Sequence, residues 1–148
     1  MKRSLFTIVF CVSLILSCQK NDDNDNNNNY IPNIAFDTLD SINTALPQYN
    51  NLQFPGNFVV LNAFGYNGIV IYSKGNNTYS AFEITDPNHA PSGCSSLTVE
   101  GIAATCNCED NNSYNIVDGA PFDGTTGQFS LKPYFVEVSG SVIRVYNN

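Results

Sequence analysis

The sequence predicts an all-β fold built from antiparallel strands. Short runs of β-branched and aromatic residues recur from Tyr30 to the end of the chain, and Gly, Asn, Asp and Pro interrupt them. No window keeps a helical period of apolar residues for more than about three turns. Residues 30–148 are enough for one domain with a modest core and too few for two. We therefore expect an antiparallel β-sandwich or barrel over 30–148.

The first seventeen residues have the pattern of a secretory signal. Lys2 and Arg3 precede an apolar core from Leu5 to Leu16, which is too short to span a bilayer as a helix. A small residue, Ser17, stands directly before Cys18, an ending that resembles a bacterial lipobox. We expect residues 1–17 to be a lipoprotein signal peptide and Cys18 to be lipidated after cleavage.

Residues 18–29 are predicted to be a disordered tether. The stretch is rich in Asn and Asp and offers no apolar side chain whose burial would offset the entropy of ordering. Lys20 followed by paired Asp residues resembles the surface-export signal of Bacteroidetes lipoproteins. The expected location is therefore the cell envelope, with a lipid anchor at Cys18 in the outer membrane, and either face of that membrane remains open.

The charge balance argues against nucleic acid as a partner. The chain has 6 basic and 13 acidic residues and a net charge of -7, and loss of Lys2 and Arg3 with the signal would bring it near -9. Such a surface repels phosphate backbones, and the sequence has no basic stripe with interleaved aromatics.

The first half of the domain reads as strands separated by turns. Asn67-Gly68 favours a tight hairpin turn because such turns require positive φ, and a second turn is expected at 74–77. The expected strands are 30–36, 58–64, 69–72 and 78–84, with an irregular segment at 37–51 that contains a short helical turn near 39–46.

The second half continues the same pattern. Glu100-Gly101 is expected to turn a small hairpin, and Ser139-Gly140 a closing one. The expected strands are 97–99, 102–105, 114–117, 129–131, 134–138 and 142–146.

Between these halves lies the chemically richest stretch, residues 86–109. It contains three of the five cysteines and the only histidine. Its spacing resembles the two ligand loops of Rieske iron-sulfur proteins. Asp86-Pro87-Asn88 stands at the first Cys-x-His box, residues 89–105 form a spacer of seventeen, and Cys106-Asn107-Cys108-Glu109 stands at the second box.

The resemblance extends over about 54–146 and implies a Rieske-like β-sandwich or barrel with a small two-loop subdomain. In that family one iron takes two thiolates and the other two imidazoles. The corresponding positions here are Asp86, Asn88, Cys106 and Glu109, of which only Cys106 has the family residue. Asp and Glu offer oxygen, and Asn is a poor iron ligand.

We therefore expect no bound cofactor and no enzymatic activity. The predicted function is that of a structural or interaction module with an unknown envelope protein as partner. The alternative is a [2Fe-2S] electron carrier with an altered ligand set, drawn from Asp86, His89, Cys94, Cys106, Cys108 and Glu109. A non-redox binder of metal or small ligands is a third hypothesis.

The resemblance also implies a disulfide between the loops. In several Rieske families the middle cysteine of the second box pairs with a cysteine after the first box, which here corresponds to Cys108 with Cys94. An exported chain lies in an oxidising compartment that favours such a bond. Cys94 with Cys106 is the alternative pairing, and either leaves one cysteine unpaired.

His89 has two interpretations. It lies one residue beyond the family's histidine position and can join a metal site with Cys106 and Glu109, or with the three cysteines of the stretch. Otherwise it is an exposed loop histidine. The sequence has no Gly-x-Ser-x-Gly elbow, phosphate-binding glycine loop or His-Glu-x-x-His motif, so no catalytic residue is expected.

Overall fold

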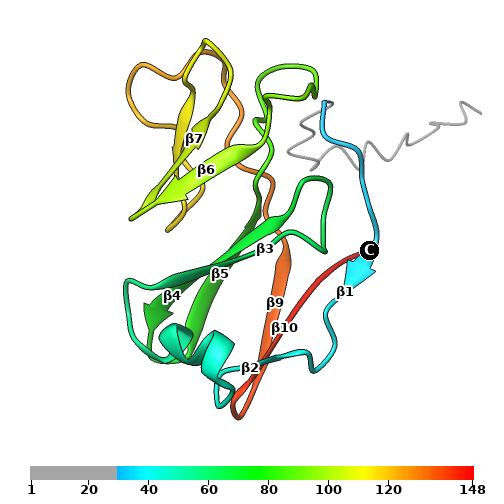
Figure 1. Ribbon diagram of the computed structural model, residues 1–148, viewed down its shortest axis with the longest axis vertical. Coiled ribbons are helices and arrows are strands. Elements are labelled where there is room, and N and C mark those ends of the chain that lie inside the picture. Colours follow the sequence, from blue (N-terminus) through cyan, green and yellow to red (C-terminus); the bar gives the residue numbers. More distant parts are fainter. Residues whose placement is uncertain (1–29) are drawn as a thin grey trace, which may run out of the picture.

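The computed structural model describes residues 30–148, which form an all-β fold as predicted (Figure 1). The predicted signal peptide, the tether and Cys18 lie outside the described residues. The elements are β1 (Phe36–Asp37), β2 (Ile42–Asn43), the 3-10 helix η1 (Pro47–Gln53), β3 (Phe58–Leu61), β4 (Ile69–Gly75), β5 (Thr78–Glu83), β6 (Leu97–Glu100), β7 (Ala103–Cys106), β8 (Ser113–Asn115), β9 (Phe135–Ser139) and β10 (Val142–Asn147).

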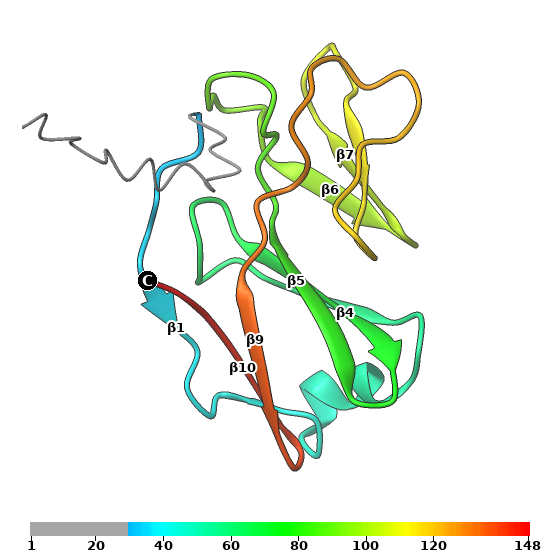
Figure 2. The ribbon, with the colours of Figure 1, turned by 180° about the vertical axis from the view of Figure 1, so that it is seen from behind.

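The strands pair in three antiparallel sheets. The outer sheet has the order β1-β10-β2 with β9 also paired to β10, the middle sheet is β3-β4-β5, and the small sheet is β6-β7-β8. Figure 2 shows the small sheet above the other two, joined to them through the chain that leaves β5 and the chain that leads back to β9. This small sheet is the two-loop subdomain that the resemblance implies.

The middle sheet is buried on both faces. On β4, Ile69 and Ile71 pack into a core shared with the outer sheet, whereas Val70 between them packs into a second core shared with the small sheet. Successive strand residues point to opposite faces, so a strand buried on both needs a continuous apolar run. That is why 69–72 lacks polar residues. The two cores join the three sheets into adjacent layers.

The β4–β5 hairpin turns where the sequence predicts. Asn76 and Asn77 have φ of 52° and 55°, so both central residues of the turn are left-handed. Asparagine tolerates this conformation better than most residues, and such turns match the twist of paired strands.

The prediction of a tight turn at Asn67-Gly68 is wrong. β3 ends at Leu61 and β4 begins at Ile69, so a loop of residues 62–68 joins them. Glu83, fully buried at the end of β5, accepts hydrogen bonds from the backbone N–H of Tyr66 at 2.7 Å and of Asn67 at 2.9 Å. The buried carboxylate stabilises a wider loop than the local sequence suggests.

Three other expectations at element level need correction. The strand predicted at 30–36 is reduced to β1, because Asn33 and Ile34 are attached to the C-terminal strand through the side chain of Asn147. Residues 129–131 form no strand. The helical turn expected near 39–46 gives way to β2, and η1 follows it from Pro47, whose ring suits the first position of a helix.

Among residues 30–148, no helix is long and apolar enough to cross a membrane.

Candidate functional site

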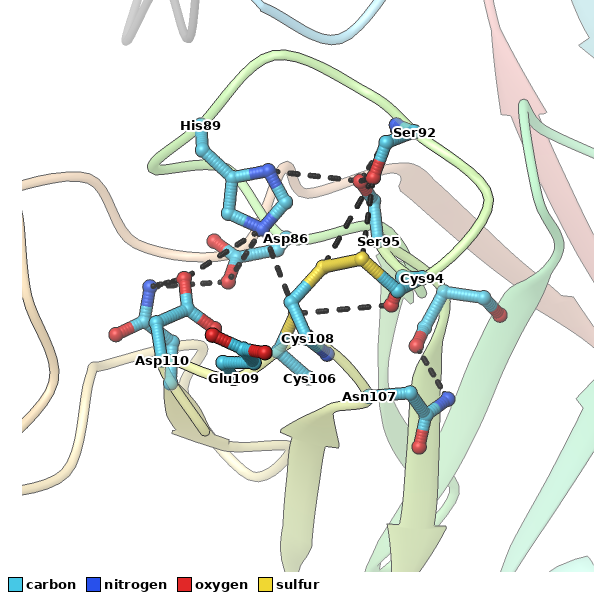
Figure 3. Close-up of a disulfide and its surroundings, with 12 residues drawn as sticks. Asp86, His89, Ser92, Cys94, Ser95, Cys106, Asn107, Cys108, Glu109 and Asp110 are labelled. Carbon is cyan, nitrogen blue, oxygen red and sulfur yellow. Dashed lines mark hydrogen bonds and ion pairs between the residues drawn. A yellow bond between two sulfur atoms is a disulfide. The ribbon is translucent and has the colours of Figure 1, made fainter.

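The two loops of the 86–109 stretch meet at one end of the small sheet (Figure 3). The first loop follows β5 and returns to β6, and the backbone N–H of Asp86 donates to the carbonyl of Ser95 across it. The second loop joins β7 to β8 and is closed by a hydrogen bond from the N–H of Cys106 to the carbonyl of Asn112 at 2.7 Å. Each loop is thus anchored by its own backbone before any side chain is considered.

A disulfide joins the loops. It links Cys94 to Cys108, the pairing that the resemblance implies, and leaves Cys106 as the free cysteine of the described residues. Since Cys94 and Cys108 are bonded to each other, a site with three thiolates and His89 is excluded in this structure. The alternative pairing of Cys94 with Cys106 is likewise absent from residues 30–148.

Asp86 is fully buried at the base of the first loop. Its Oδ1 accepts hydrogen bonds from the Tyr114 hydroxyl at 2.7 Å and from the Asn88 N–H at 2.8 Å, and its Oδ2 accepts one from the Asn112 amide at 3.0 Å. A buried carboxylate needs such donors to offset lost hydration. Burial, with the nearby Asp86 carboxylate, also raises the pKa of the Tyr114 hydroxyl.

Asn88 is held by residues that lie outside the two loops. Its amide nitrogen donates to the Tyr114 hydroxyl and to the carbonyl of Phe129, both at 2.9 Å, and its Oδ1 accepts from the N–H of Phe129 at 2.9 Å. It lies so close to Gly127 that any side chain there would collide with it. At this family histidine position, the side chain connects the first loop to the segment before β9.

His89 takes the place that Asn88 leaves. Figure 3 shows its Nε2 directed toward the junction, 3.4 Å from Oδ2 of Asp86, 3.6 Å from Oδ2 of Asp110 and 3.5 Å from Sγ of Cys106. The side chain is 27% exposed, so His89 is a partly exposed loop histidine that also faces the junction. Its Nδ1 lies 3.0 Å from the carbonyl oxygen of Ala90.

Cys106 supplies a buried thiol at the end of β7. Burial raises its pKa to about 12, and the nearby carboxylates of Asp86 and Asp110 add to the shift. The backbone N–H of Cys108 donates to its sulfur at 3.5 Å. The free thiol is therefore neutral at ordinary pH.

Asp110 takes the place at the junction that the resemblance implies for Glu109. Glu109 is exposed and is not among the close donor groups of the described residues, whereas Asp110 reaches the junction and is oriented by the Asn112 amide at 3.0 Å. Donor atoms of Asp86, His89, Cys106 and Asp110 all lie within 4.8 Å of one another. In both loops the residue one position beyond the family histidine faces the centre.

Sequence reasoning missed Asp110, Asn112 and Tyr114 as parts of the site. The available signal was the displacement of His89 by one residue, which suggested a similar displacement in the second loop. Asn112 and Tyr114 carried no such signal, because their role depends on the fold bringing β8 and the residue before it to Asp86.

Comparisons with known proteins give a structural likeness only. No protein-family model matches the sequence, and no curated protein matches it. One similar solved chain belongs to a complex of reduced oxygenase and oxidized ferredoxin in carbazole 1,9a-dioxygenase, with 24% identity, a TM-score of 0.43, and coverage of 62% of this chain and 90% of that one. Another is the ferredoxin of carbazole 1,9a-dioxygenase from Nocardioides aromaticivorans IC177, with 16% identity, a TM-score of 0.40, and coverage of 64% and 88%. We take the chemistry of the site from this chain's own residues.

Proposed function

We propose that this protein is a lipid-anchored component of the cell envelope whose Rieske-like domain acts as a structural or interaction module, without a [2Fe-2S] cluster. The observation that carries the proposal is the engagement of Asn88 at a ligand position. Its amide makes three hydrogen bonds, one to the Tyr114 hydroxyl and two to the backbone of Phe129. A ligand role would require breaking all three.

The remaining family positions fit a cluster poorly. Asp86 and Glu109 carry oxygen where the family has sulfur and nitrogen, and Glu109 is exposed. Sulfide-bridged iron favours thiolates and imidazoles, and this junction offers one free thiol and one imidazole. Half of the needed soft ligands are missing.

The disulfide supplies what a cluster would otherwise provide, a covalent connection between the loops. Cys94 and Cys108 close a loop with a sequence separation of 14. By chain entropy such a bond contributes about 3 kcal/mol to stability. The loops therefore need no metal to remain together.

A surface for a protein partner is available on the outer sheet. Leu39 and Val138 are exposed apolar residues that line one shallow groove with Arg144. Apolar side chains bordered by charge are typical of protein contacts. This supports an interaction role and leaves the identity of the envelope partner to experiment.

The cluster is tested by reconstitution. The chain from residue 18 on, carrying Cys18→Ser, is incubated without oxygen with iron and sulfide, and its visible spectrum and the EPR of the reduced sample are recorded. We expect a colourless protein with one free thiol that reacts only after unfolding. Bound iron with a reduced-state EPR signal would establish the alternative, an electron carrier with an altered ligand set.

The anchor is tested separately. Cells expressing the full chain or its Cys18→Ala variant are labelled with a lipid precursor. Lipid should enter the unaltered chain alone. Equal labelling of both would contradict lipidation at Cys18 and with it the membrane attachment.

A further inference from the structure

We propose that Asp86, His89, Cys106 and Asp110 form a binding site for a single divalent metal ion of the zinc class. This site requires no sulfide and uses two residues, His89 and Asp110, outside the family's ligand positions. It goes beyond the proposed function, because a module without a [2Fe-2S] cluster can carry such an ion or lack it.

The first argument is the tautomer of His89. Its Nδ1 lies 3.0 Å from the carbonyl oxygen of Ala90, and a carbonyl can only accept a hydrogen bond. Nδ1 also lies 3.5 Å from the Ser95 hydroxyl, which can donate or accept. In the tautomer in which Nδ1 donates to Ala90, the shorter of the two contacts, Nε2 presents a lone pair to the junction. That lone pair faces carboxylate oxygens of Asp86 and Asp110, which also only accept when ionised.

Nε2 and the carboxylate oxygens of Asp86 and Asp110 meet at the junction as acceptors, and the Cys106 sulfur joins them when a metal displaces its proton. A proton added to Nε2 can point at one neighbour at a time, whereas three neighbours surround it at nearly equal distances. A metal ion contacts all of them together. The arrangement thus fits an ion better than it fits a single hydrogen bond.

The distances suit a tetrahedral ion. Zinc bonds of about 2.0–2.3 Å to nitrogen, oxygen and sulfur place neighbouring donor atoms roughly 3.3–3.6 Å apart. The separations from Nε2 to the two carboxylate oxygens and to Sγ of Cys106 are 3.4, 3.6 and 3.5 Å. The three separations from Nε2 thus match a tetrahedral ion, and the remaining donor atoms lie within 4.8 Å of one another.

Outer contacts already orient the donors. The Asn112 amide donates to Oδ2 of both Asp86 and Asp110 at 3.0 Å, the Tyr114 hydroxyl fixes Oδ1 of Asp86, and the N–H of Cys108 donates to the sulfur of Cys106. Hydrogen bonds of this kind set the direction of metal ligands. The carbonyl of Ala90 does the same for His89.

The mixture of donors indicates the class of metal. One sulfur, one imidazole and two carboxylates suit a borderline ion such as Zn²⁺, whereas calcium and magnesium prefer oxygen alone. Two side chains are fully or nearly fully buried, and His89 and Asp110 are each 27% exposed, which leaves a path for entry from solvent.

The test uses Co²⁺ and Zn²⁺ with the chain from residue 18 on carrying Cys18→Ser, in thiol-free buffer without sulfide, so that the disulfide stays intact. We expect one equivalent of Co²⁺ with a thiolate charge-transfer band, displaced by Zn²⁺ in calorimetry. His89→Gln and Asp110→Asn remove direct ligands, so each should weaken binding by more than the roughly tenfold that loss of an outer contact can cost, and Cys106→Ser should abolish the band.

Glu109→Gln is the matched control, because Glu109 adjoins Asp110 and lies outside the four donors. It should bind Co²⁺ as the unaltered chain does. No uptake, or uptake unaffected by His89→Gln, would overturn the proposal, and circular dichroism checks that each variant is folded. Failure here leaves the proposed function standing, whereas cluster formation with iron and sulfide would end the proposed function without Co²⁺ being involved.

Discussion

Two fully buried carboxylates lie three residues apart, and their surroundings differ in kind. Glu83 receives only donors, namely two backbone N–H groups and the hydroxyls of Thr85 and Tyr134, both at 2.7 Å. Asp86 receives three donors, and its Oδ2 also faces His89, with Cys106 and Asp110 nearby. The hydrogen bonds of Glu83 are therefore satisfied by donors, whereas Asp86 belongs to a cluster of polar groups that could share a metal ion.

The difference separates a structural role from a candidate binding role. A carboxylate saturated by donors gains nothing from a cation and stabilises the fold by its own hydrogen bonds. A carboxylate that converges with other acceptors is stabilised further by a cation. We expect a substitution at Glu83 to destabilise the fold. A metal ion should stabilise the fold through Asp86 and not through Glu83.

The largest effect is expected from Glu83→Gln. The amide replaces an acceptor with a donor that faces the N–H and hydroxyl groups of the 62–68 loop and Tyr134. Loss of charge-assisted hydrogen bonds in a buried position should lower the free energy of unfolding by about 4 kcal/mol. Urea denaturation measures it. A loss below about 1 kcal/mol would mean that Glu83 does not anchor the loop.

Removal of the disulfide should cost slightly less. Cys94→Ser with Cys108→Ser frees a loop with a sequence separation of 14, and the chain-entropy effect predicts a loss of about 3 kcal/mol. Urea denaturation without reductant gives the value. If the double variant unfolds at the same urea concentration as the unaltered chain, the loops are held together by their other contacts alone.

Zinc should stabilise the folded protein through the site that contains Asp86 and not through Glu83. At a free Zn²⁺ concentration 100 times the Kd, binding to the folded state adds about 2.7 kcal/mol to stability. The increase should vanish in His89→Gln and persist in Glu109→Gln. An equal rise in thermal unfolding midpoint for all three chains would place the ion elsewhere on the surface.

The smallest effect concerns an exposed carboxylate. Asp37 accepts hydrogen bonds from Arg144 at 2.6 and 3.0 Å, and these, with the N–H of Leu39, hold its pKa below the ordinary 3.8. A lowered pKa stabilises the fold above pH 3.8, and this contribution disappears as the pH falls through the folded-state pKa. Asp37→Asn should therefore lower the urea midpoint slightly at pH 7, and the difference should shrink as the pH falls below 3.8. A difference that grows at low pH would contradict this sign.

Much of the fold was predictable because its signals are local. The apolar run at Ile69–Tyr72 and the turn at Asn76-Asn77 specify a buried strand and its hairpin from neighbouring residues alone. The 62–68 loop was not, because its conformation depends on Glu83 from another strand. The predicted length of the strand at 30–36 was wrong for a similar reason, since the side chain of Asn147 from the C-terminal strand bonds Asn33 and Ile34.

The location of the site was predictable from the sequence, but only some of the residues that form it were. The spacing of Asp86 and Cys106 located the two loops, and both residues lie at the junction. The choice between Asn88 and His89, or between Glu109 and Asp110, depends on which side chain is captured by Tyr114, Phe129 and Asn112. Those partners come from later in the chain, so no local pattern reveals them.

These loops are joined by a disulfide, and we propose that they carry no sulfide-bridged iron. Acid-labile sulfide, iron and the non-reduced peptide map of the protein purified from its native envelope test both points together. We predict no acid-labile sulfide, a linked Cys94–Cys108 peptide, and one Cys106 thiol that is alkylated only after unfolding. Iron and acid-labile sulfide in equal amounts, with Cys94 and Cys108 unlinked, would contradict the account.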